Sequence, residues 1–152
     1  MITTRAGRPD DAPRLNEMRR ALWPDEDFPG EREQELAELF AGKWSRTYPY
    51  VIFVAEVGGE VAGFVEVTMR SYADGCDPKQ PVGYLEGWFV EESHRRKGVG
   101  AALVRAAADW ARGQGCVEFA SDTWLESEGS QKAHEALGFE VVDRVVNYRK
   151  AL

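Results

Sequence analysis

The feature that most constrains the fold is a pair of apolar, β-branched segments separated by two glycines. Residues 51–57 read VIFVAEV, residues 61–68 read VAGFVEVT, and Gly58 and Gly59 lie between them. Consecutive glycines supply the positive φ angles that a tight hairpin turn needs, and runs of β-branched residues favour strands. The two segments therefore predict an antiparallel hairpin, and the other elements must pack around the sheet that it begins.

The remaining elements are predicted from apolar spacing and turn residues. We expect strands at residues 2–5, 84–90 and 116–121, and one long or two short strands at 139–148. We expect helices at residues 10–22, 31–40, 99–112 and 127–137. Gly87 within a strand predicts a bulge. This order predicts a mixed α/β sheet covered by helices, with parallel strands where a helix intervenes, in one domain spanning residues 1–152.

Composition narrows the possible partners. The chain has 152 residues, of which 43% are hydrophobic, and its formal net charge is −7. An acidic chain of this kind is not expected to bind nucleic acid or an anionic membrane, and it would attract a cationic partner. No apolar run reaches the roughly 20 residues that span a bilayer, and the first residues do not resemble a signal peptide. We therefore expect a cytoplasmic protein.

The cysteines and histidines do not form a recognised metal motif. Cys76 and Cys116 are far apart, with no CxxC spacing, and the two histidines are His94 and His134. Zinc sites need closer sets of such ligands, so we expect no metal and reduced cysteines.

The segment EESHRRKGVGA, residues 91–101, is the strongest functional signal. It lies between a predicted strand and the start of a predicted helix. Gly98 and Gly100 let a ligand approach the backbone, and the amides and dipole of the helix start favour an anion. The segment lacks the lysine–serine pair of nucleoside triphosphatases and the glycine pattern of dinucleotide-binding domains. A cradle for pyrophosphate is predicted, and a solvated turn is the alternative.

Arg95-x-x-Gly98-x-Gly100 resembles the acetyl-coenzyme A signature of the GCN5-related N-acetyltransferases (GNAT), whose order of elements is the one predicted above. The resemblance implies a twisted, mainly antiparallel sheet with a splayed parallel pair of strands and helices on both faces. Acetyl-CoA would be the co-substrate, with its pantetheine between the splayed strands. The implied coenzyme contacts are Phe89, Val90, Arg95, Arg96, Lys97, Gly98, Val99, Gly100 and Ala101.

The resemblance extends to the aminoglycoside 6'-N-acetyltransferases and covers nearly the whole chain. The segments that carry it are LWP at 22–24, YADGCD at 72–77, LEGWFV at 85–90, ASDT at 120–123, SQKAHEALGFE at 130–140 and YRK at 148–150. The implied function is acetylation of the 6'-amine of aminoglycoside antibiotics, which confers resistance. The implied acceptor site combines aromatic faces with carboxylates, from Trp23, Tyr72, Glu86, Asp122 and Glu140.

Acetyl transfer to an amine requires removal of a proton, because aliphatic amines are charged at neutral pH. Glu86, beside the predicted bulge, is the expected base, acting directly or through a water. The alternative for Glu86 is a structural carboxylate, and the alternative for Asp122 is a turn or helix cap. Amides near Phe89 and Val90 would stabilise the oxyanion.

The proton donor to the departing thiolate is less defined. His134 stands where the superfamily often has a tyrosine, and it is either this donor or a residue on the helix surface or against the coenzyme. Tyr148 is a second candidate, and a thiolate can also leave without a dedicated acid. No activated nucleophile is evident, which favours direct attack in a ternary complex over an acyl-cysteine route.

Two alternatives to this function are open, and the resemblance also implies how the chain assembles. Substrate loops vary while the coenzyme motif stays, so the acceptor is alternatively a polyamine, a peptide or a small-metabolite amine. A non-catalytic acyl-CoA-binding module is a remote possibility. The resemblance also implies a homodimer, for which Trp44, Trp88 and Trp124 are candidate interface residues.

Overall fold

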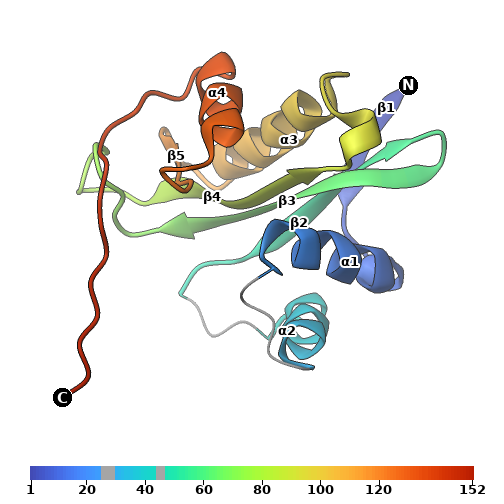
Figure 1. Ribbon diagram of the computed structural model, residues 1–152, viewed down its shortest axis with the longest axis horizontal. Helices are drawn as coiled ribbons and strands as arrows, with labels where there is room; N and C mark the ends of the chain where they lie inside the picture. Colours follow the sequence, from blue (N-terminus) through green and yellow to red (C-terminus); the bar gives the residue numbers. More distant parts are fainter. Residues whose placement is uncertain (25–29, 44–46) are drawn as a thin grey trace.

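The computed structural model describes residues 1–24, 30–43 and 47–152, and the strands among them form one sheet (Figure 1). The strands lie in chain order across it: β1 (Ile2–Ala6), β2 (Val51–Val57), β3 (Glu60–Arg70), β4 (Val82–Val90) and β5 (Phe119–Ser121). Strands β1 to β4 are antiparallel, and β5 is parallel to β4 because a helix returns the chain between them. The predicted mixed sheet with a parallel pair of strands is confirmed. The expectation of parallel strands wherever a helix intervenes is wrong for β1 and β2, which are antiparallel neighbours although α1 (Ala12–Leu22) and α2 (Glu31–Phe40) lie between them.

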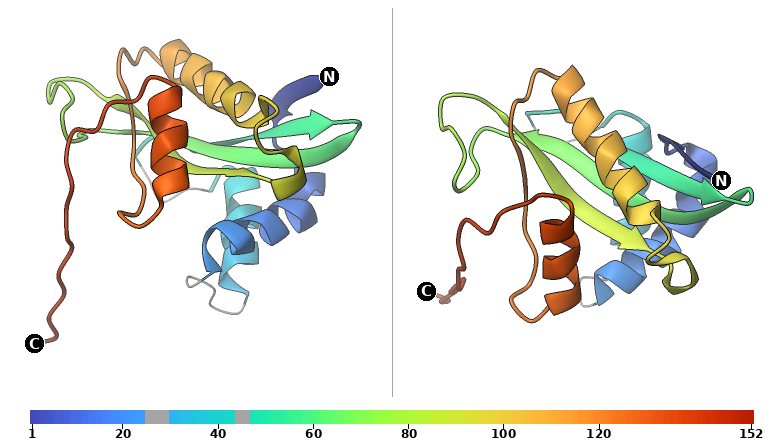
Figure 2. Two further views of the ribbon diagram at one scale, coloured as in Figure 1. Left: turned by 45° about the horizontal axis from the view of Figure 1, so that its top comes forward. Right: turned by 90° about the horizontal axis from the view of Figure 1, so that it is seen from above.

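Helices cover both faces of the sheet (Figures 1 and 2). The helices are α1 (Ala12–Leu22), α2 (Glu31–Phe40), α3 (Val99–Gly113) and α4 (Glu128–Ala136). Figure 1 shows α1 and α2 on one face and α3 and α4 on the other. Neighbouring residues of β3 therefore serve separate cores: Phe64 packs with α1 and α2, whereas Val65 packs with α3. This two-sided burial explains why the segment is a continuous apolar run.

The glycine-linked hairpin is confirmed. Strands β2 and β3 pair in antiparallel register from Val51 opposite Val67 to Val57 opposite Glu60. Gly58 and Gly59 have φ angles of 61° and 84°, in the left-handed region that side chains rarely adopt. The local turn chemistry was therefore sufficient to set the connection and the pairing next to it, and farther from the turn the register shifts by one residue between Ala55 and Glu56.

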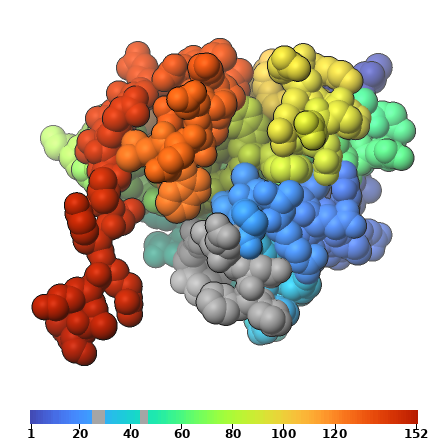
Figure 3. Space-filling view, viewed as in Figure 1, coloured from blue at the N-terminus to red at the C-terminus, as the bar shows by residue number. Residues whose placement is uncertain are grey.

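The predicted strand at residues 139–148 is wrong. The structure has no helix or strand after α4. Phe139 packs against Phe119, and the C-terminal segment, residues 140–152, then extends away from the body of the molecule (Figure 3). Its valines are exposed: Val141, Val142, Val145 and Val146 are 56–66% accessible. A strand requires a neighbouring strand edge, and none of the described strands of this chain pairs with this segment.

Candidate functional site

A bulge in β4 sets the orientation of Glu86. The pairing of β3 with β4 passes from Glu66–Gly87 to Val67–Leu85, so Glu86 is an extra residue with no partner position on β3. The extra residue returns the side chain of Glu86 to the face covered by α1 and α2. The bulge that Gly87 predicted is confirmed, and its consequence is that a carboxylate of the central strand faces a cavity.

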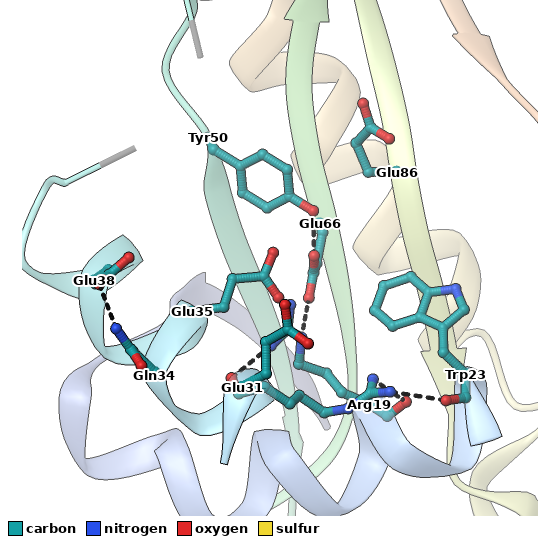
Figure 4. Close-up of a pocket in the computed structure, with 10 residues that line it drawn as sticks. Arg19, Trp23, Glu31, Gln34, Glu35, Glu38, Tyr50, Glu66 and Glu86 are labelled. Carbon is teal, nitrogen blue, oxygen red and sulfur yellow. Dashed lines mark hydrogen bonds and ion pairs between the residues drawn. The ribbon is translucent and has the colours of Figure 1, made fainter. Parts of the chain in front are cut away.

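This cavity, of about 740 Å³, opens between the sheet and helices α1 and α2 (Figure 4). Carboxylates and aromatic rings dominate its lining, which consists of Arg19, Trp23, Glu31, Arg32, Gln34, Glu35, Glu38, Tyr50, Glu66 and Glu86. The acidic helix α2 thus faces the same space as Glu86. An excess of carboxylates with low-dielectric walls concentrates cations.

One wall of the cavity is a buried polar cluster. The guanidinium Nε of Arg19 donates to Oε1 of Glu66 at 2.7 Å, and the Tyr50 hydroxyl donates to the other oxygen, Oε2. Glu66 is fully buried and Arg19 is 3% exposed. Burial raises the pKa of the Glu66 carboxyl, against the opposing effect of Arg19. Burial also raises the pKa of the Tyr50 phenol, so this hydroxyl is a neutral hydrogen-bonding group in the cavity.

A chain of polar contacts runs from Glu86 to the end of β5. Arg70 bonds both carboxylate oxygens of Glu86, Nε to Oε1 at 3.0 Å and Nη2 to Oε2 at 2.8 Å. The same guanidinium lies 3.5 Å from the ring centroid of Tyr84. The Tyr84 hydroxyl donates to Oδ2 of Asp122 at 2.6 Å. Burial first, and then this hydrogen bond, raise the pKa of Tyr84. The structure therefore connects Glu86 and Asp122, two of the three carboxylates predicted for the acceptor.

The segment before α3 has the backbone geometry of an anion site. Gly98 is the N-cap of α3 with φ 88°, Arg96 also has a positive φ of 59°, and no side chain caps the helix. The amides of the first helical turn therefore have no side-chain acceptor. Arg95 and Lys97 bond the backbone, through Nε to the Val90 carbonyl and Nζ to the Ser93 carbonyl, both at 2.8 Å. These contacts hold the loop close to the end of β4.

Gly100 also has a packing requirement. A Cβ there would lie 2.9 Å from Cζ2 of Trp88, so the absence of a side chain lets Trp88 pack beneath the start of α3. Gly98 is less crowded, because its nearest neighbour would be Ile2 at 3.6 Å, and its requirement is the left-handed conformation. The two glycines therefore act through packing and through backbone conformation, respectively.

Strands β4 and β5 pair only from Gly83–Phe119 to Leu85–Ser121. Beyond this point, no described strand covers the β5 side of β4, including Phe89 and Val90. His134 lies beside the point of separation: its Nε2 is 2.8 Å from Oγ of Ser121, and its Nδ1 is 2.7 Å from the Ser130 carbonyl. A carbonyl accepts, so Nδ1 carries a proton and the imidazole has a fixed orientation.

Comparison with known proteins identifies the family of this site. The family model described as "Acetyltransferase (GNAT) family" matches residues 15–139. The chain belongs to the GNAT acetyltransferase family. A relative from Klebsiella aerogenes, aminoglycoside N(6')-acetyltransferase type 1, is 49% identical over 89% of this GNAT chain and 87% of its own length. A relative of the same name from Stenotrophomonas maltophilia is 40% identical over 99% of this chain and 94% of its own.

Solved structures agree with this GNAT assignment. AAC(6')-Iy, in complex with a bisubstrate analogue, CoA-S-monomethyl-acetylneamine, aligns with a TM-score of 0.87 at 34% identity, over 100% of this chain and 99% of its own. The aminoglycoside 6'-N-acetyltransferase AAC(6')-IG from Acinetobacter haemolyticus aligns with a TM-score of 0.85 at 30% identity, over 99% of both chains. The fold of this GNAT chain is therefore that of solved aminoglycoside acetyltransferases.

Of the other residues predicted for the site of the GNAT chain, three are exposed and one, Trp23, lines the cavity. Tyr72 is 58% exposed, and its hydroxyl donates to Asp74 at 3.1 Å. Glu140 is exposed just after α4. Tyr148 is 92% exposed and lies on the C-terminal segment, which Figure 1 shows running away from the sheet and the helices. Trp23, by contrast, lines the cavity with Glu86. The sequence also predicts that Pro24 to Asp27, directly after Trp23, form a loop that folds over the acceptor, and residues 25–27 of this loop lie outside the described residues.

Sequence reasoning missed Arg70, Tyr50 and the Arg19–Glu66 pair. Glu66 carried a usable signal, since it is a charged residue in the middle of an otherwise apolar strand and must be paired if buried. Arg70 and Tyr50 carried none, because only the tertiary structure brings them to Glu86 and Glu66.

Among the described residues, no group of three or more His, Cys, Asp or Glu side chains is arranged to hold a metal ion. None of the described helices is both long and apolar enough to cross a membrane.

Proposed function

We propose that this chain transfers the acetyl group of acetyl-CoA to the 6'-amine of aminoglycoside antibiotics and thereby confers resistance. The observation that carries the proposal is Glu86, which the β4 bulge directs into an acidic cavity beside the separation of β4 and β5. Relatives that are 40–49% identical are named for this activity, which supports the choice of acceptor. We treat residues 1–152 as one catalytic unit.

The acceptor chemistry follows from the charges of the cavity. An aminoglycoside is a polycation, so Glu31, Glu35 and Glu38 on α2 attract it. Trp23 offers an aromatic face to the sugar, and Asp122 receives a further amino group. Glu86 takes the proton from the reacting ammonium, directly or through a water, and leaves a nucleophilic nitrogen.

The acyl group is then transferred directly. The nitrogen forms a bond to the acyl carbon, amides of Phe89 and Val90 stabilise the oxyanion, and the carbon–sulfur bond breaks. An acyl-cysteine route is disfavoured, because burial raises the pKa of both Cys76 and Cys116 and so reduces their thiolate fractions.

The coenzyme is placed along the edge of β4 and the start of α3. The unpaired β5 side of β4 has room for the extended pantetheine, and the amides from Arg96 to Ala101 bind the pyrophosphate. Arg95, which donates to the Val90 carbonyl, adds positive charge between the pantetheine and the pyrophosphate. Acetyl-CoA is thus a co-substrate that brings the acyl group to the side of the sheet that Glu86 faces.

The departing thiolate receives its proton from His134. The contact between His134 and Ser121, at the end of the β4–β5 pairing, places an imidazole beside the expected path of the thioester. In its protonated form the ring donates through Nε2, while Nδ1 stays on the Ser130 carbonyl. Tyr148 is the weaker choice because it is 92% exposed on the C-terminal segment.

The decisive experiment follows thiol release from acetyl-CoA with two aminoglycosides that differ only at position 6', one bearing an amine and one a hydroxyl. We expect release with the amine alone, because a hydroxyl is not acetylated at this site. A polyamine is offered in parallel. Turnover with the polyamine only would move the proposal to a different acceptor, and coenzyme binding without turnover would indicate a binding module.

The chain is also proposed to act as a homodimer. The C-terminal segment carries four exposed valines and extends from the body, and exposed apolar surface of this kind favours burial against a partner. Trp124, 68% exposed, is a further candidate contact. Trp88 is packed against Gly100 and is not available, and Trp44 lies outside the described residues. Light scattering on the full chain and on a chain ending at Glu140 tests this: the first should be dimeric and the second monomeric.

We place the reaction in the cytoplasm, where acetyl-CoA is used and where unpaired cysteines such as Cys76 and Cys116 remain reduced. Fractionation of cells that produce the chain would test this, and activity in the periplasmic fraction would contradict it.

A further inference from the structure

A guanidinium occupies the position at which the acceptor's ammonium is expected. Arg70, the last residue of β3, holds both oxygens of Glu86 in a two-pronged ion pair, at 3.0 and 2.8 Å. Two-pronged arginine–carboxylate pairs combine charge with fixed geometry. The carboxylate that is expected to receive the acceptor amine therefore already has a cation bound to it.

The surroundings of Arg70 resemble those of a bound organic cation. Its guanidinium carbon lies 3.5 Å from the ring centroid of Tyr84, and Tyr84 in turn is hydrogen-bonded to Asp122. An aromatic face with carboxylates on either side is the arrangement that recognises an ammonium group of a ligand. The same features that would bind an amino sugar are thus occupied by a side chain of the protein.

We propose that Arg70 is an internal counter-ion that the aminoglycoside must displace, and that it thereby sets the affinity for the acceptor. The inference rests on the proposed function, because it takes Glu86 as the carboxylate that receives the reacting amine. Two cations next to one carboxylate repel each other, so the ammonium and the guanidinium exclude one another from Glu86. Arg70 is a determinant of acceptor binding through this competition.

Exposure indicates that the displacement is feasible. The side chain of Arg70 is 42% exposed, whereas that of Glu86 is 13% exposed. An ion pair with one partner at the surface is weak, and the long arginine side chain reaches solvent easily. A polycation that also contacts the carboxylates of α2 therefore outcompetes a single guanidinium.

The test is the substitution Arg70→Gln, which removes the charge and leaves a shorter polar side chain. Thiol-release kinetics should give a KM for the 6'-amino aminoglycoside about threefold to tenfold lower than that of the wild type. The KM for acetyl-CoA should not change. Arg70→Lys keeps the charge but not the two-pronged geometry. Its KM for the aminoglycoside should lie between those of the wild type and Arg70→Gln.

Arg112→Gln is the matched control for net charge. Arg112 is paired with Asp109 on the exposed side of α3, with both side chains at least 65% exposed. The substitution Arg112→Gln changes the net charge of the chain by the same amount as Arg70→Gln, at a position far from Glu86. A fall in the acceptor KM in both variants would indicate a general charge effect and would overturn the proposal.

A second measurement does not depend on turnover. In nitrogen-15 NMR spectra, the Arg70 Nε–H signal, identified by its absence from Arg70→Gln, should shift and exchange faster when the aminoglycoside is added. An unchanged signal at saturating aminoglycoside overturns the inference. So does a lower kcat without a lower acceptor KM in Arg70→Gln, since that result assigns Arg70 to positioning Glu86.

The two proposals fail in different ways. Absence of thiol release by the wild type with the 6'-amino compound contradicts the proposed function, and the Arg70 signal then decides the inference alone. Normal release by the wild type, with an acceptor KM unchanged in Arg70→Gln, contradicts the inference and leaves the proposed function intact.

Discussion

The indole of Trp23 lies directly against Gly87, at a distance that leaves no room for a side chain. A Cβ at position 87 would lie 2.6 Å from Cη2 and 2.7 Å from Cζ2 of the ring. Gly87 adjoins the bulged residue Glu86, so one glycine both follows the bulge and admits the aromatic wall of the cavity. The position of Trp23 at the end of α1 is thereby tied to the catalytic strand.

Replacing Gly87 with alanine should move Trp23 and weaken acceptor binding. Overpacking of this kind destabilises by about 1–3 kcal/mol, and the displaced indole should raise the acceptor KM. Urea unfolding and thiol-release kinetics measure the two effects. Gly129→Ala in α4 is the control, because a Cβ there meets no atom within 4 Å and stability should hold or rise. Equal effects of both substitutions would contradict the argument.

Glu66→Gln should be one of the most destabilising polar substitutions in the chain. It would leave the charge of Arg19, which is 3% exposed, without its buried partner. Breaking a buried ion pair lowers the free energy of unfolding by about 3–5 kcal/mol. Denaturant titration gives the free energy of unfolding. Glu17→Gln, which removes a pair with Arg14 at the surface, should change that free energy by less than about 0.5 kcal/mol. A loss below about 1 kcal/mol for Glu66→Gln would refute the buried-pair account.

Asp11 should make stability depend on pH in the acid range. Its hydrogen bonds from Arg5, at 2.7 and 2.8 Å, lower the pKa of this buried carboxyl below its ordinary value of 3.8. The unfolded chain therefore binds this proton more readily than the folded chain. The stabilisation is complete above the unfolded pKa and is lost as pH falls through the lower, folded pKa.

Asp11→Asn should accordingly destabilise the chain at about pH 7 and have a smaller effect at about pH 3, below the unfolded pKa, where the wild type has lost part of the same stabilisation. Urea unfolding at both pH values measures the difference. Asp109→Asn, at an exposed pair with Arg112, serves as the control and should show little effect at either pH. A pH-independent effect of Asp11→Asn would contradict the assigned pKa shift.

Gly98→Ala should weaken binding of acetyl-CoA more than binding of the acceptor. Its φ of 88° lies in the left-handed region, where alanine is disfavoured by about 1 kcal/mol, and relaxation would misalign the first amides of α3. The expected result is a raised KM for acetyl-CoA. Gly115→Ala, with φ 90° after α3, should cause a similar loss of stability and leave that KM unchanged. A similar rise in both variants would indicate general destabilisation.

His134→Gln should lower kcat, because the amide cannot give a proton to the departing thiolate. The contacts of His134 with Ser121 and Ser130 predict that Ser121→Ala lowers kcat to a smaller extent. Thiol-release kinetics at saturating substrate concentrations measure kcat. An unchanged kcat would show that the thiolate leaves without a proton from His134.

Local pattern determined much of the fold. The hairpin with Gly58 and Gly59, and the helix bounds of α2, follow from turn chemistry and periodicity that involve only neighbouring residues. The bulge was likewise visible in Gly87 within an apolar strand. The same local reasoning failed at residues 139–148, because apolar content predicts the capacity to form a strand and not the presence of a neighbouring edge.

The sequence by itself determined the order of elements as far as α4, the glycine-containing loop before α3 with Gly98, and Glu86 as the carboxylate of interest. Only the tertiary structure decided what contacts Glu86: Arg70 from the neighbouring strand, with Tyr84 joining Arg70 to Asp122. These contacts join residues 14 to 38 positions apart in the chain. Hydrogen bonds and ion pairs of this kind depend on register and on the packing of helices against the sheet, which no periodicity encodes.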